Sequence, residues 1–290
     1  MILLLGGSGY VGSAFQKFFR QNNHAYINIS RAERDYTHPE ILRTIITELK
    51  PDFLINCAGY TGKPNVDACE LHKTETIEGN VVLPGNIMKV CNELNLPWGH
   101  VSSGCIYTGN SPDGLGFRET DAPNFDYRHN NCSFYSGSKA LAEEILSEAE
   151  NCYLWRLRVP FNNEATPRNY LTKLMKYEKL LDATNSLSQL DEFVAAAHAC
   201  WQERIPCGIY NMTNPGFVTA REVVAMISKA GLTDKKFSFF ESEEEFMKTA
   251  AKTPRSSCVL NCDKREAAGA HMTEVHKAIE IALKDWETNK

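Results

Sequence analysis

The sequence has no excess of positive charge and no long hydrophobic run. Its 290 residues carry 31 Lys and Arg against 36 Asp and Glu, which gives a formal net charge of −5. Such a surface does not suit a nucleic acid backbone or an anionic membrane. Apolar stretches stay at strand length, as in residues 53–58, and the apolar start at 2–5 breaks at glycine. We therefore expect no signal peptide, no membrane-spanning helix and a cytoplasmic location.

Residue spacings typical of metal sites are also missing. None of the ten cysteines forms a Cys-x-x-Cys pair, and no two of the eight histidines stand four residues apart. These absences argue against a structural zinc site and a thioredoxin-like redox centre, so we expect no metal. In a cytoplasmic protein the cysteines are expected to be reduced thiols, most of which serve as small buried hydrophobic side chains.

Strand and helix patterns alternate through the first half of the chain. Short apolar runs predict strands at 2–5, 25–29, 53–56, 99–102 and 153–158. Helical spacing of apolar residues predicts helices at 10–20, 39–49, 76–94 and 135–149. The alternation predicts an α/β fold with a Rossmann-type doubly wound parallel sheet. Residues 104–131 lose this periodicity, and so long a loop is usually functional or mobile.

The second half of the chain is less regular. Helices are expected at 168–181, 190–204, 220–230 and 273–286, with a strand at 208–211 and a charged stretch around 241–245. We expect a smaller C-terminal α/β lobe packed on the sheet. The predicted division gives residues 1–160, plus about 184–205, to the Rossmann-type domain, and it gives 161–183 and 206–290 to the smaller lobe.

A glycine motif follows the first predicted strand. Gly6, Gly9 and Gly12 have the spacing Gly-x-x-Gly-x-x-Gly and lead into a predicted helix. Glycines permit a tight turn and the close approach of a pyrophosphate, which the N–H groups at the helix N-terminus attract. This position in the chain favours a dinucleotide cofactor over a turn that is merely rich in glycine.

The residues after the second predicted strand bear on the choice of cofactor. Ser30, Arg31 and Arg34 stand where an NAD site normally has an acidic residue, and their hydroxyl and cationic groups suit a 2′-phosphate. NADPH is therefore favoured over NADH. The alternative is that Glu33 or Asp35 binds the ribose while the arginines are solvated.

A second motif, Tyr135-x-x-x-Lys139, opens the predicted helix at 135–149. Residues four apart share a helix face, and an ammonium beside a phenol lowers the phenol's pKa from about 10, which makes it a usable proton donor. Ser102 and Ser103 end a predicted strand at the edge where parallel sheets bind ligands. A hydroxyl there is placed to polarise a substrate carbonyl.

Together these motifs resemble the extended short-chain dehydrogenase/reductase superfamily over the whole chain. Finer features resemble its dTDP-4-dehydrorhamnose reductases and, more closely, the plant-type nucleotide-rhamnose synthases, which are UDP-4-keto-6-deoxyglucose 3,5-epimerase/4-reductases. The segments that carry the closer likeness are 56–59, 61–67, 69–70, 104–106, 123–125, 133–136, 167–169, 213–216 and 254–256.

The resemblance, taken with the motifs, implies that the Rossmann domain (1–160, plus about 184–205) binds NADP and that the smaller lobe (161–183 and 206–290) binds the substrate. It also implies a set of binding residues. The cofactor would contact Gly6, Gly9, Tyr10, Val11, Gly12, Ser30, Arg31, Arg34, Asn56, Ala58, Gly59, Tyr135 and Lys139. The substrate would contact Thr61, Ser102, Asn169 and Arg255. For Asn169 and Arg255 the alternative is ordinary hydrogen bonding within a loop.

Five residues are the expected catalytic group. The bacterial reductases typically read Ser-Thr-Asp-Tyr where this chain reads Ser102-Ser103-Gly104-Cys105, so a thiol stands two residues beyond the proposed catalytic hydroxyl. A cysteine whose pKa of about 8.5 is adjusted by a nearby charge can move protons next to a ketone. Its implied partner is Lys173, with Lys176 and Lys179 as rivals. Ser103, Tyr135 and Lys139 complete the group.

The resemblance thus implies a 3,5-epimerase/4-reductase that makes UDP-L-rhamnose from UDP-4-keto-6-deoxy-D-glucose with NADPH. Its substrate would come from a separate 4,6-dehydratase, and a homodimer is one possible assembly. The nearest alternative is a reductase alone, acting on an already epimerised dTDP- or UDP-sugar, with Cys105 structural. An alternative of another class is a non-catalytic, NADP-sensing regulatory subunit, which the intact set of Ser103, Tyr135 and Lys139 argues against.

Overall fold

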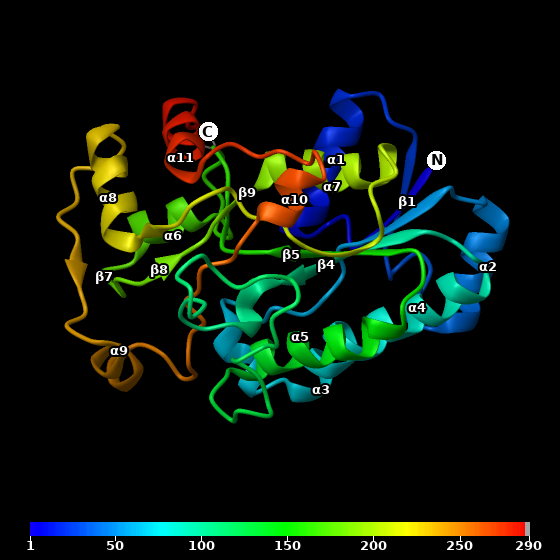
Figure 1. Cartoon of the computed structure of the whole chain (residues 1–290), viewed down its shortest axis with the longest axis horizontal. Helices are drawn as coiled ribbons and strands as arrows, with labels where there is room; N and C mark the ends of the chain where they lie inside the picture. Colours follow the sequence, from blue (N-terminus) through cyan, green and yellow to red (C-terminus); the bar gives the residue numbers. More distant parts are fainter. Residues whose placement is uncertain (288–290) are drawn as a thin grey trace.

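A computed structural model describes residues 1–287 and is built around one six-stranded sheet (Figure 1). Every strand pair in this sheet is parallel, and the strand order is β10-β5-β4-β3-β1-β2. The strands are β1 (Ile2–Leu5), β2 (Tyr26–Ile29), β3 (Phe53–Asn56), β4 (Trp98–Ser103), β5 (Cys152–Leu157) and β10 (Gly208–Asn211). The predicted Rossmann-type fold is confirmed.

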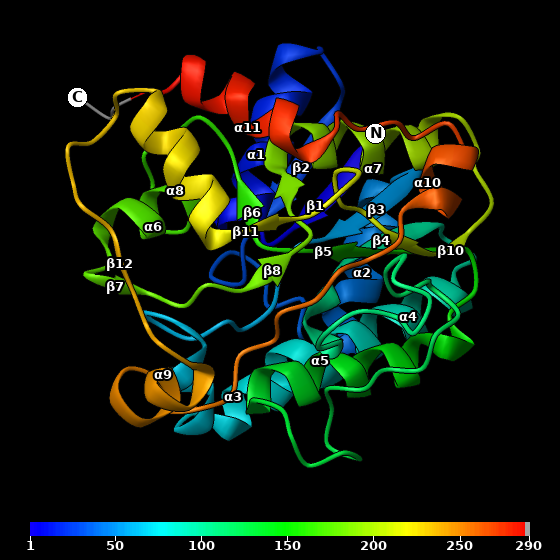
Figure 2. The same cartoon turned by 60° about the vertical axis from the view of Figure 1, so that its left-hand side comes forward.

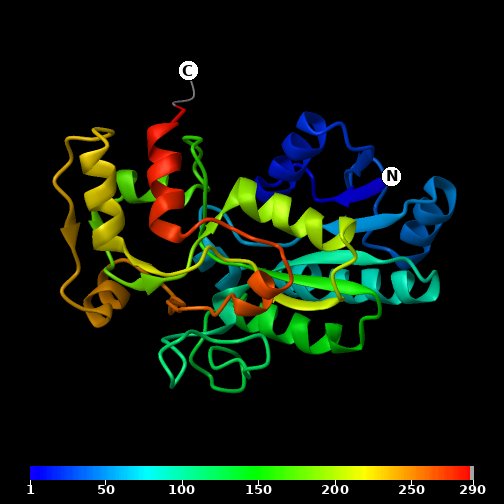
Figure 3. The same cartoon turned by 45° about the horizontal axis from the view of Figure 1, so that its top comes forward.

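Helices cover both faces of the sheet, as Figure 3 shows. On one face α1 (Tyr10–Gln21) packs beside α7 (Leu190–Gln202), where Phe15 and Phe193 meet over Trp155. On the other face lie α2 (Pro39–Leu49), α4 (Leu83–Glu93) and α5 (Phe134–Ile145). Both cores are continuous and apolar, as expected for a parallel sheet buried on both sides.

The segment predicted as one helix at 76–94 is divided into three pieces in the structure. It consists of α3 (Lys73–Ile77), a π-helical turn η2 (Glu78–Val82) and α4. The wider turn buries Asn80 completely, and this side chain bonds to neighbouring segments. A single-turn π-bulge leaves the apolar pattern on either side nearly unchanged, so the sequence predicts one uninterrupted helix.

Part of the C-terminal half forms a smaller lobe, whose helices α6 (Tyr170–Lys176) and α8 (Ala220–Lys229) stand to the left of the central sheet in Figure 2. Its own core gathers apolar residues from α6, α8 and α11. The remaining elements of this half are β6 (Pro160–Phe161), α6 (Tyr170–Lys176), β7 (Lys179–Leu180), β8 (Thr184–Asn185), β9 (Ser188–Gln189), β11 (Val218–Thr219), α8 (Ala220–Lys229), β12 (Ser238–Phe239), α9 (Glu243–Thr249), α10 (Asp263–Ala267) and α11 (Val275–Lys284). Of these, α10 lies against β10 of the central sheet.

Two details of this half differ from the sequence expectation. The helix predicted at 168–181 ends with α6 at Lys176, because β7 pairs with β12 from sixty residues further on. The strand at 208–211 forms as predicted, but it pairs with β5 in the central sheet, although the sequence assigns it to the substrate lobe. The division into a cofactor domain and a substrate lobe stays a prediction.

The irregular loop from 107 to 131 is tied to the C-terminal segment. It follows the 3-10 turn η3 (Gly104–Ile106), and single β-bridges join Gly109 to Cys258 and Phe117 to Leu260. Two further 3-10 turns are η1 (Val66–Glu70) and η4 (Leu146–Glu148). Within residues 1–287, no helix is long and apolar enough to cross a membrane. All ten cysteines are free thiols.

Candidate active site

The glycine turn between β1 and α1 leaves no room for side chains at two positions. Gly6 has a φ of +77°, and a Cβ there would lie 2.4 Å from the Ala58 nitrogen. A Cβ on Gly12 would lie 2.2 Å from the Gly6 carbonyl oxygen. The helix begins at Tyr10 after Gly9, with no side-chain cap on its first turn. Its uncapped N–H groups and positive dipole end fit a pyrophosphate.

Two of the polar residues after β2, Ser30 and Arg34, already have partners. The Ser30 hydroxyl and backbone N–H donate to the Glu33 carboxylate at 2.7 and 2.8 Å, and these bonds lower the pKa of Glu33. Arg34 pairs with Glu48 at 2.5 Å. Arg31 is exposed and, within residues 1–287, forms no ion pair. Of the cations expected at the 2′-phosphate, Arg31 is therefore the one free to bind it.

The loop after β3 runs beside Lys139. Asn56 accepts from the Ala58 N–H at 3.0 Å and bonds to His100 at 3.0 Å, which fixes the start of the loop. A Cβ on Gly59 would lie 3.8 Å from the Lys139 Nζ, so this loop and α5 approach closely. Thr61 follows on the surface.

Asn80 is a site residue that the sequence reasoning missed. Its side-chain oxygen accepts from the Tyr60 N–H at 2.8 Å, and its amide donates to the Tyr60 carbonyl at 2.9 Å and the Ser138 hydroxyl at 3.0 Å. It thereby clamps the Gly59 loop to α5 beside Lys139. The available signal in the sequence is an amide within an otherwise apolar helix pattern; the structure adds that it is buried on a π-turn of the kind found at functional sites.

Ser103, Cys105 and Tyr135 are brought together between β4 and α5. The Ser103 hydroxyl accepts from the Cys105 N–H at 3.2 Å and so caps the turn η3. Ser133 caps α5, accepting from the Ser136 N–H at 3.1 Å, which places Tyr135 in the first turn of the helix. The Tyr135 phenol bonds to the Ser103 hydroxyl.

Burial governs the electrostatics of this group. It raises the pKa of Tyr135 well above its usual range, which hydrogen bonding to Ser103 and the charge of Arg158 partly offset. The sequence expectation of a lowered phenol pKa is therefore wrong for this structure, because burial outweighs the nearby cations. Burial also lowers the pKa of Lys139 and raises that of Cys105.

Three predicted substrate contacts have other partners. Ser102 lies on the opposite face of β4 from Ser103, and its buried hydroxyl donates to Glu143 at 2.7 Å. Asn169 is fully buried as the N-cap of α6 and donates to carbonyls of the preceding loop. Arg255 pairs with Asp67 at 2.8 Å and remains 22% exposed. Of the three, Arg255 alone keeps an accessible side chain.

Lys173 stands out from its two rivals. Burial lowers the pKa of Lys173, and the charge of Arg168 lowers it further. Within the described residues its amine forms no ion pair or hydrogen bond. Lys176 is exposed, and Lys179 is paired with Glu245. Among residues 1–287 no contact joins Lys173 to Cys105, so the structure does not itself bring the proposed pair together.

Two buried arginines near the end of β5 were not foreseen. Arg156 pairs with Glu143 at 2.7 Å, in the same buried group as Ser102. Arg158 is equally buried, and its charge acts on both Cys105 and Tyr135. The sequence signal is two arginines alternating with apolar residues in a buried strand, where charges are rare.

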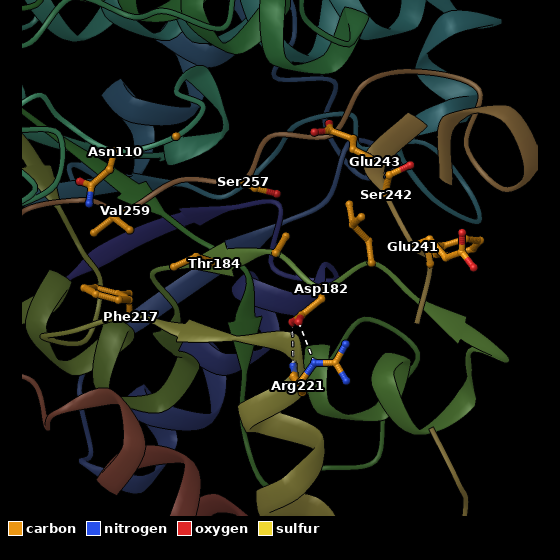
Figure 4. Close-up of a pocket in the computed structure, with 14 residues that line it drawn as sticks. Asn110, Asp182, Thr184, Phe217, Arg221, Glu241, Ser242, Glu243, Ser257 and Val259 are labelled. Carbon is orange, nitrogen blue, oxygen red and sulfur yellow. Dashed lines mark hydrogen bonds and ion pairs between the residues drawn. The ribbon is translucent and has the colours of Figure 1, made fainter. Parts of the chain in front are cut away.

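A cavity of about 770 Å³ is lined by residues of the small lobe, by the loop at 109–110 and by Ser257 and Val259. Figure 4 shows Phe217 and Val259 at one end and Ser242 and Glu243 at the other. Asp182 and Arg221 pair with each other at 2.9 Å in its wall. None of the residues that line it in the described part of the chain is a predicted site residue.

Comparisons with known proteins agree with the fold and the motifs. The chain matches the RmlD substrate binding domain family over residues 1–288. It is 34% identical to the bifunctional dTDP-4-dehydrorhamnose 3,5-epimerase/dTDP-4-dehydrorhamnose reductase of Arabidopsis thaliana over 96% of this chain and 90% of the relative. A trifunctional Arabidopsis dehydratase/epimerase/reductase is 35% identical, but the match covers 90% of this chain and 38% of that protein.

Solved structures show the same fold. The UDP-rhamnose synthase of Acanthamoeba polyphaga mimivirus superposes with a TM-score of 0.89 at 24% identity, over 98% of both chains. A Bacillus anthracis dTDP-4-dehydrorhamnose reductase in complex with NADP gives 0.81 at 16% identity, over 98% of this chain and 97% of that one. The predicted resemblance is confirmed.

Proposed function

Because the chain belongs to the RmlD substrate binding domain family, we propose that it is a 3,5-epimerase/4-reductase that converts UDP-4-keto-6-deoxy-D-glucose to UDP-L-rhamnose with NADPH. The observation that carries the proposal is the Cys105 thiol, buried in the same turn as the Ser103 hydroxyl that bonds to Tyr135. One group able to polarise a carbonyl and one able to move a proton therefore share a site. The names of the Arabidopsis relatives support both activities.

The epimerase step uses the acidity of carbons next to a ketone. Ser103 and Tyr135 bond to the C4 oxygen and stabilise the charge that develops there when a proton leaves C3 or C5. In the D-gluco ring the hydrogens at C3 and C5 are on one face, so one group removes both and another delivers both from the opposite face. Each group then returns to its starting state by exchange with solvent.

The directions of two pKa shifts support separate roles for Lys173 and Cys105. Burial lowers the pKa of Lys173, which favours a neutral amine able to accept a proton. Burial raises the pKa of Cys105, which keeps the thiol protonated and able to donate. Environments that push two pKa values apart are a mark of an acid and base pair. We therefore assign Lys173 as the base and Cys105 as the acid.

The reduction step uses the same site. Bound NADPH supplies the hydride for C4. Tyr135 would then protonate the oxygen while Ser103 holds it, and Lys139, beside the Gly59 loop, would hold the nicotinamide ribose. The glycine turn would hold the pyrophosphate, and Arg31 the 2′-phosphate that distinguishes NADPH.

We assign the nucleoside end of the substrate to the cavity beside Phe217. This ring is 48% exposed and offers a flat apolar face on which a pyrimidine can stack. Ser257 and Val259 line the same cavity and flank Cys258, whose thiol donates to the Gly104 carbonyl. The cavity therefore begins next to the catalytic turn. Phe217→Ala is expected to raise KM for the nucleotide sugar and leave NADPH binding unchanged.

One observation favours a reductase that acts alone on pre-epimerised sugar: Lys173 does not contact Cys105 among the described residues. The test incubates the protein with NADPH and UDP-4-keto-6-deoxyglucose in deuterated water and follows the product by NMR. We expect rhamnose configuration with deuterium at both C3 and C5. Absence of turnover, with turnover of the pre-epimerised sugar, would leave only the reductase.

Cys105→Ser provides the matched variant. It is expected to reduce pre-epimerised substrate at close to the normal rate and to lose turnover of the un-epimerised sugar. Unchanged turnover of both would make Cys105 structural. The 4-keto-6-deoxy sugar itself requires a 4,6-dehydration, and we propose that a separate dehydratase supplies it. A cytoplasmic location also stays a proposal, supported by the ten free thiols.

A further inference from the structure

Arg158 is a buried cation without an acidic partner. It is 5% exposed, and within residues 1–287 no carboxylate lies at ion-pair distance from it. The two other fully buried arginines do have such partners: Arg156 pairs with Glu143 at 2.7 Å and Arg265 with Glu266 at 2.6 Å. A buried charge without a counter-charge is costly, so its retention calls for a reason.

The partners of Arg158 are neutral. Its Nη2 donates to the Asn185 side-chain oxygen and, at 2.6 Å, to the Ser256 carbonyl, while its Nε makes no hydrogen bond. These contacts orient the guanidinium without neutralising its charge. The positive charge is therefore left to act on an anion formed nearby.

The side chain of Arg158 runs beneath the catalytic turn. A Cβ on Gly104 would lie 3.6 Å from the Arg158 Cδ, and Gly104 joins Ser103 to Cys105. The Asn185 oxygen that accepts from Arg158 also accepts from the Cys258 N–H at 3.2 Å. Cys258 in turn donates its thiol to the Gly104 carbonyl at 3.3 Å. Arg158 and the turn thus belong to one hydrogen-bonded unit.

The backbone around Arg158 is held firmly. Its N–H donates to the Ser188 hydroxyl at 3.0 Å, and the Ser188 N–H donates to its carbonyl at 2.7 Å. The next residue, Val159, has a φ of +38°, a conformation that a β-branched side chain rarely adopts. Strain of this kind persists where the surroundings fix the chain, as they do at active sites.

The groups that face Cys105 come from several elements. Ser103 and Ser136 bond to the thiol, and the titratable neighbours are Tyr135, Lys139, Cys69, Cys132 and Arg158. The cations among them are Lys139 and Arg158. Lys139 can lose its proton because burial lowers its pKa, whereas a guanidinium stays charged at every relevant pH.

We propose that Arg158 is a positioning residue for Cys105, whose fixed charge stabilises the thiolate left behind when the thiol gives its proton to the sugar. In that step the S–H bond breaks, and a C–H bond forms from the double bond of the enolate, whose negative charge on the C4 oxygen is lost. The C4 carbonyl is restored, and the sulfur carries the negative charge until it is reprotonated from water. The catalytic part of this inference rests on the proposed epimerase function.

The test is a titration of the Cys105 thiol that needs no substrate. Alkylation by a small thiolate-selective reagent is followed against pH, with peptide mass spectrometry to isolate Cys105 from the other nine cysteines. Arg158→Met removes the charge and is expected to raise the alkylation midpoint by about one pH unit, with about tenfold slower alkylation at neutral pH. Arg158→Gln, which also removes the charge, replaces Arg158→Met in this test if that variant does not fold.

Two charge-retaining variants separate this effect from a loss of structure. Arg158→Lys is expected to restore the midpoint to within a few tenths of a pH unit. Arg156→Lys makes the same chemical change at a paired arginine two residues earlier in the chain and is expected to leave the midpoint where it is. An unshifted midpoint in both neutral variants, or equal shifts in Arg158→Lys and Arg158→Met, overturns the proposal.

Deuterium exchange into the sugar distinguishes a failure of the epimerase function from a failure of the role proposed for Arg158. If wild-type protein exchanges no deuterium but the alkylation midpoint shifts in Arg158→Met, the epimerase function fails and the coupling of Arg158 to Cys105 stands. If wild-type protein exchanges deuterium and the midpoint does not shift, the function stands and this inference fails.

Discussion

Gly9 and Gly12 stand three residues apart in the cofactor turn, but an alanine meets different surroundings at each. At Gly12 the new methyl would lie 2.2 Å from the Gly6 carbonyl oxygen and 2.6 Å from the Gly7 Cα, and neither backbone atom can rotate away. At Gly9 the nearest atom is the Gly6 carbonyl oxygen at 3.4 Å, which is an ordinary contact, and φ is −77°. Gly12→Ala should therefore strain the fold, whereas Gly9→Ala should not.

The expected difference in stability between the two variants follows from these contacts. Overpacking of this severity costs about 1–3 kcal/mol, which for a chain of this length lowers Tm by roughly 5 °C. Gly9→Ala should leave Tm unchanged or slightly raised, because alanine reduces the entropy of the unfolded chain. If the pyrophosphate lies against Gly9, the same methyl weakens NADPH binding by about 10–100-fold, as expected for losing one or two charge-assisted hydrogen bonds.

Two measurements test this reasoning. Thermal unfolding without cofactor reports the packing effect, and a fluorescence titration with NADPH reports the binding effect. A Tm that falls equally in both variants would show that the steric argument is wrong. Normal NADPH affinity in Gly9→Ala would place the pyrophosphate elsewhere.

Three further predictions test other parts of the structure. Glu143→Gln leaves the buried Arg156 uncompensated and should cost about 3–5 kcal/mol in a denaturant titration; a loss below about 1 kcal/mol would contradict the buried pair. His198 has a pKa of about 4 because it is buried, so the folded state binds fewer protons than the unfolded state below about pH 6.5, and stability falls by up to about 3 kcal/mol as pH drops toward 4. His198→Phe should flatten that decline in pH-dependent unfolding, and an unaltered slope would assign it to other groups. Lys173→Met should abolish deuterium exchange into the sugar while Lys176→Met, on the exposed side of the helix, leaves it intact; equal effects would remove the assignment of the base.

Elements with strong local signals were predictable from the sequence. The helix at 39–49 begins with proline in its first turn and ends at Lys50 in the left-handed conformation, and its bounds match the apolar pattern. The strands at 53–56 and 208–211 match as well. In each case the residues that determine the element lie within it or next to it, so the sequence alone contains the cause.

The structure differs from the sequence prediction where the residues that determine an element lie far from it in the chain. The π-turn at 78–82 is held by the contacts of Asn80 with Tyr60 and Ser138, and α6 stops where β7 meets a strand sixty residues away. The site divides in the same way. Motif residues such as Tyr135 and Lys139 are recognisable by spacing. For Asn80 and Arg158 the local pattern shows only a polar or charged residue among apolar ones, and their roles depend on tertiary contacts.

Ser102 and Ser103 show how one position along a strand decides between structure and chemistry. Side chains alternate across a sheet, so the Ser102 hydroxyl reaches Glu143 on α5 while the Ser103 hydroxyl reaches Tyr135. Glu143 also binds Arg156, which pairs in register with Ser102 on the neighbouring strand. This buried group fixes α5 against the sheet, and α5 carries Tyr135. The contact between the two catalytic hydroxyls therefore depends on a charge pair that touches neither of them, and a substitution at Glu143 should lower kcat even in protein that remains folded.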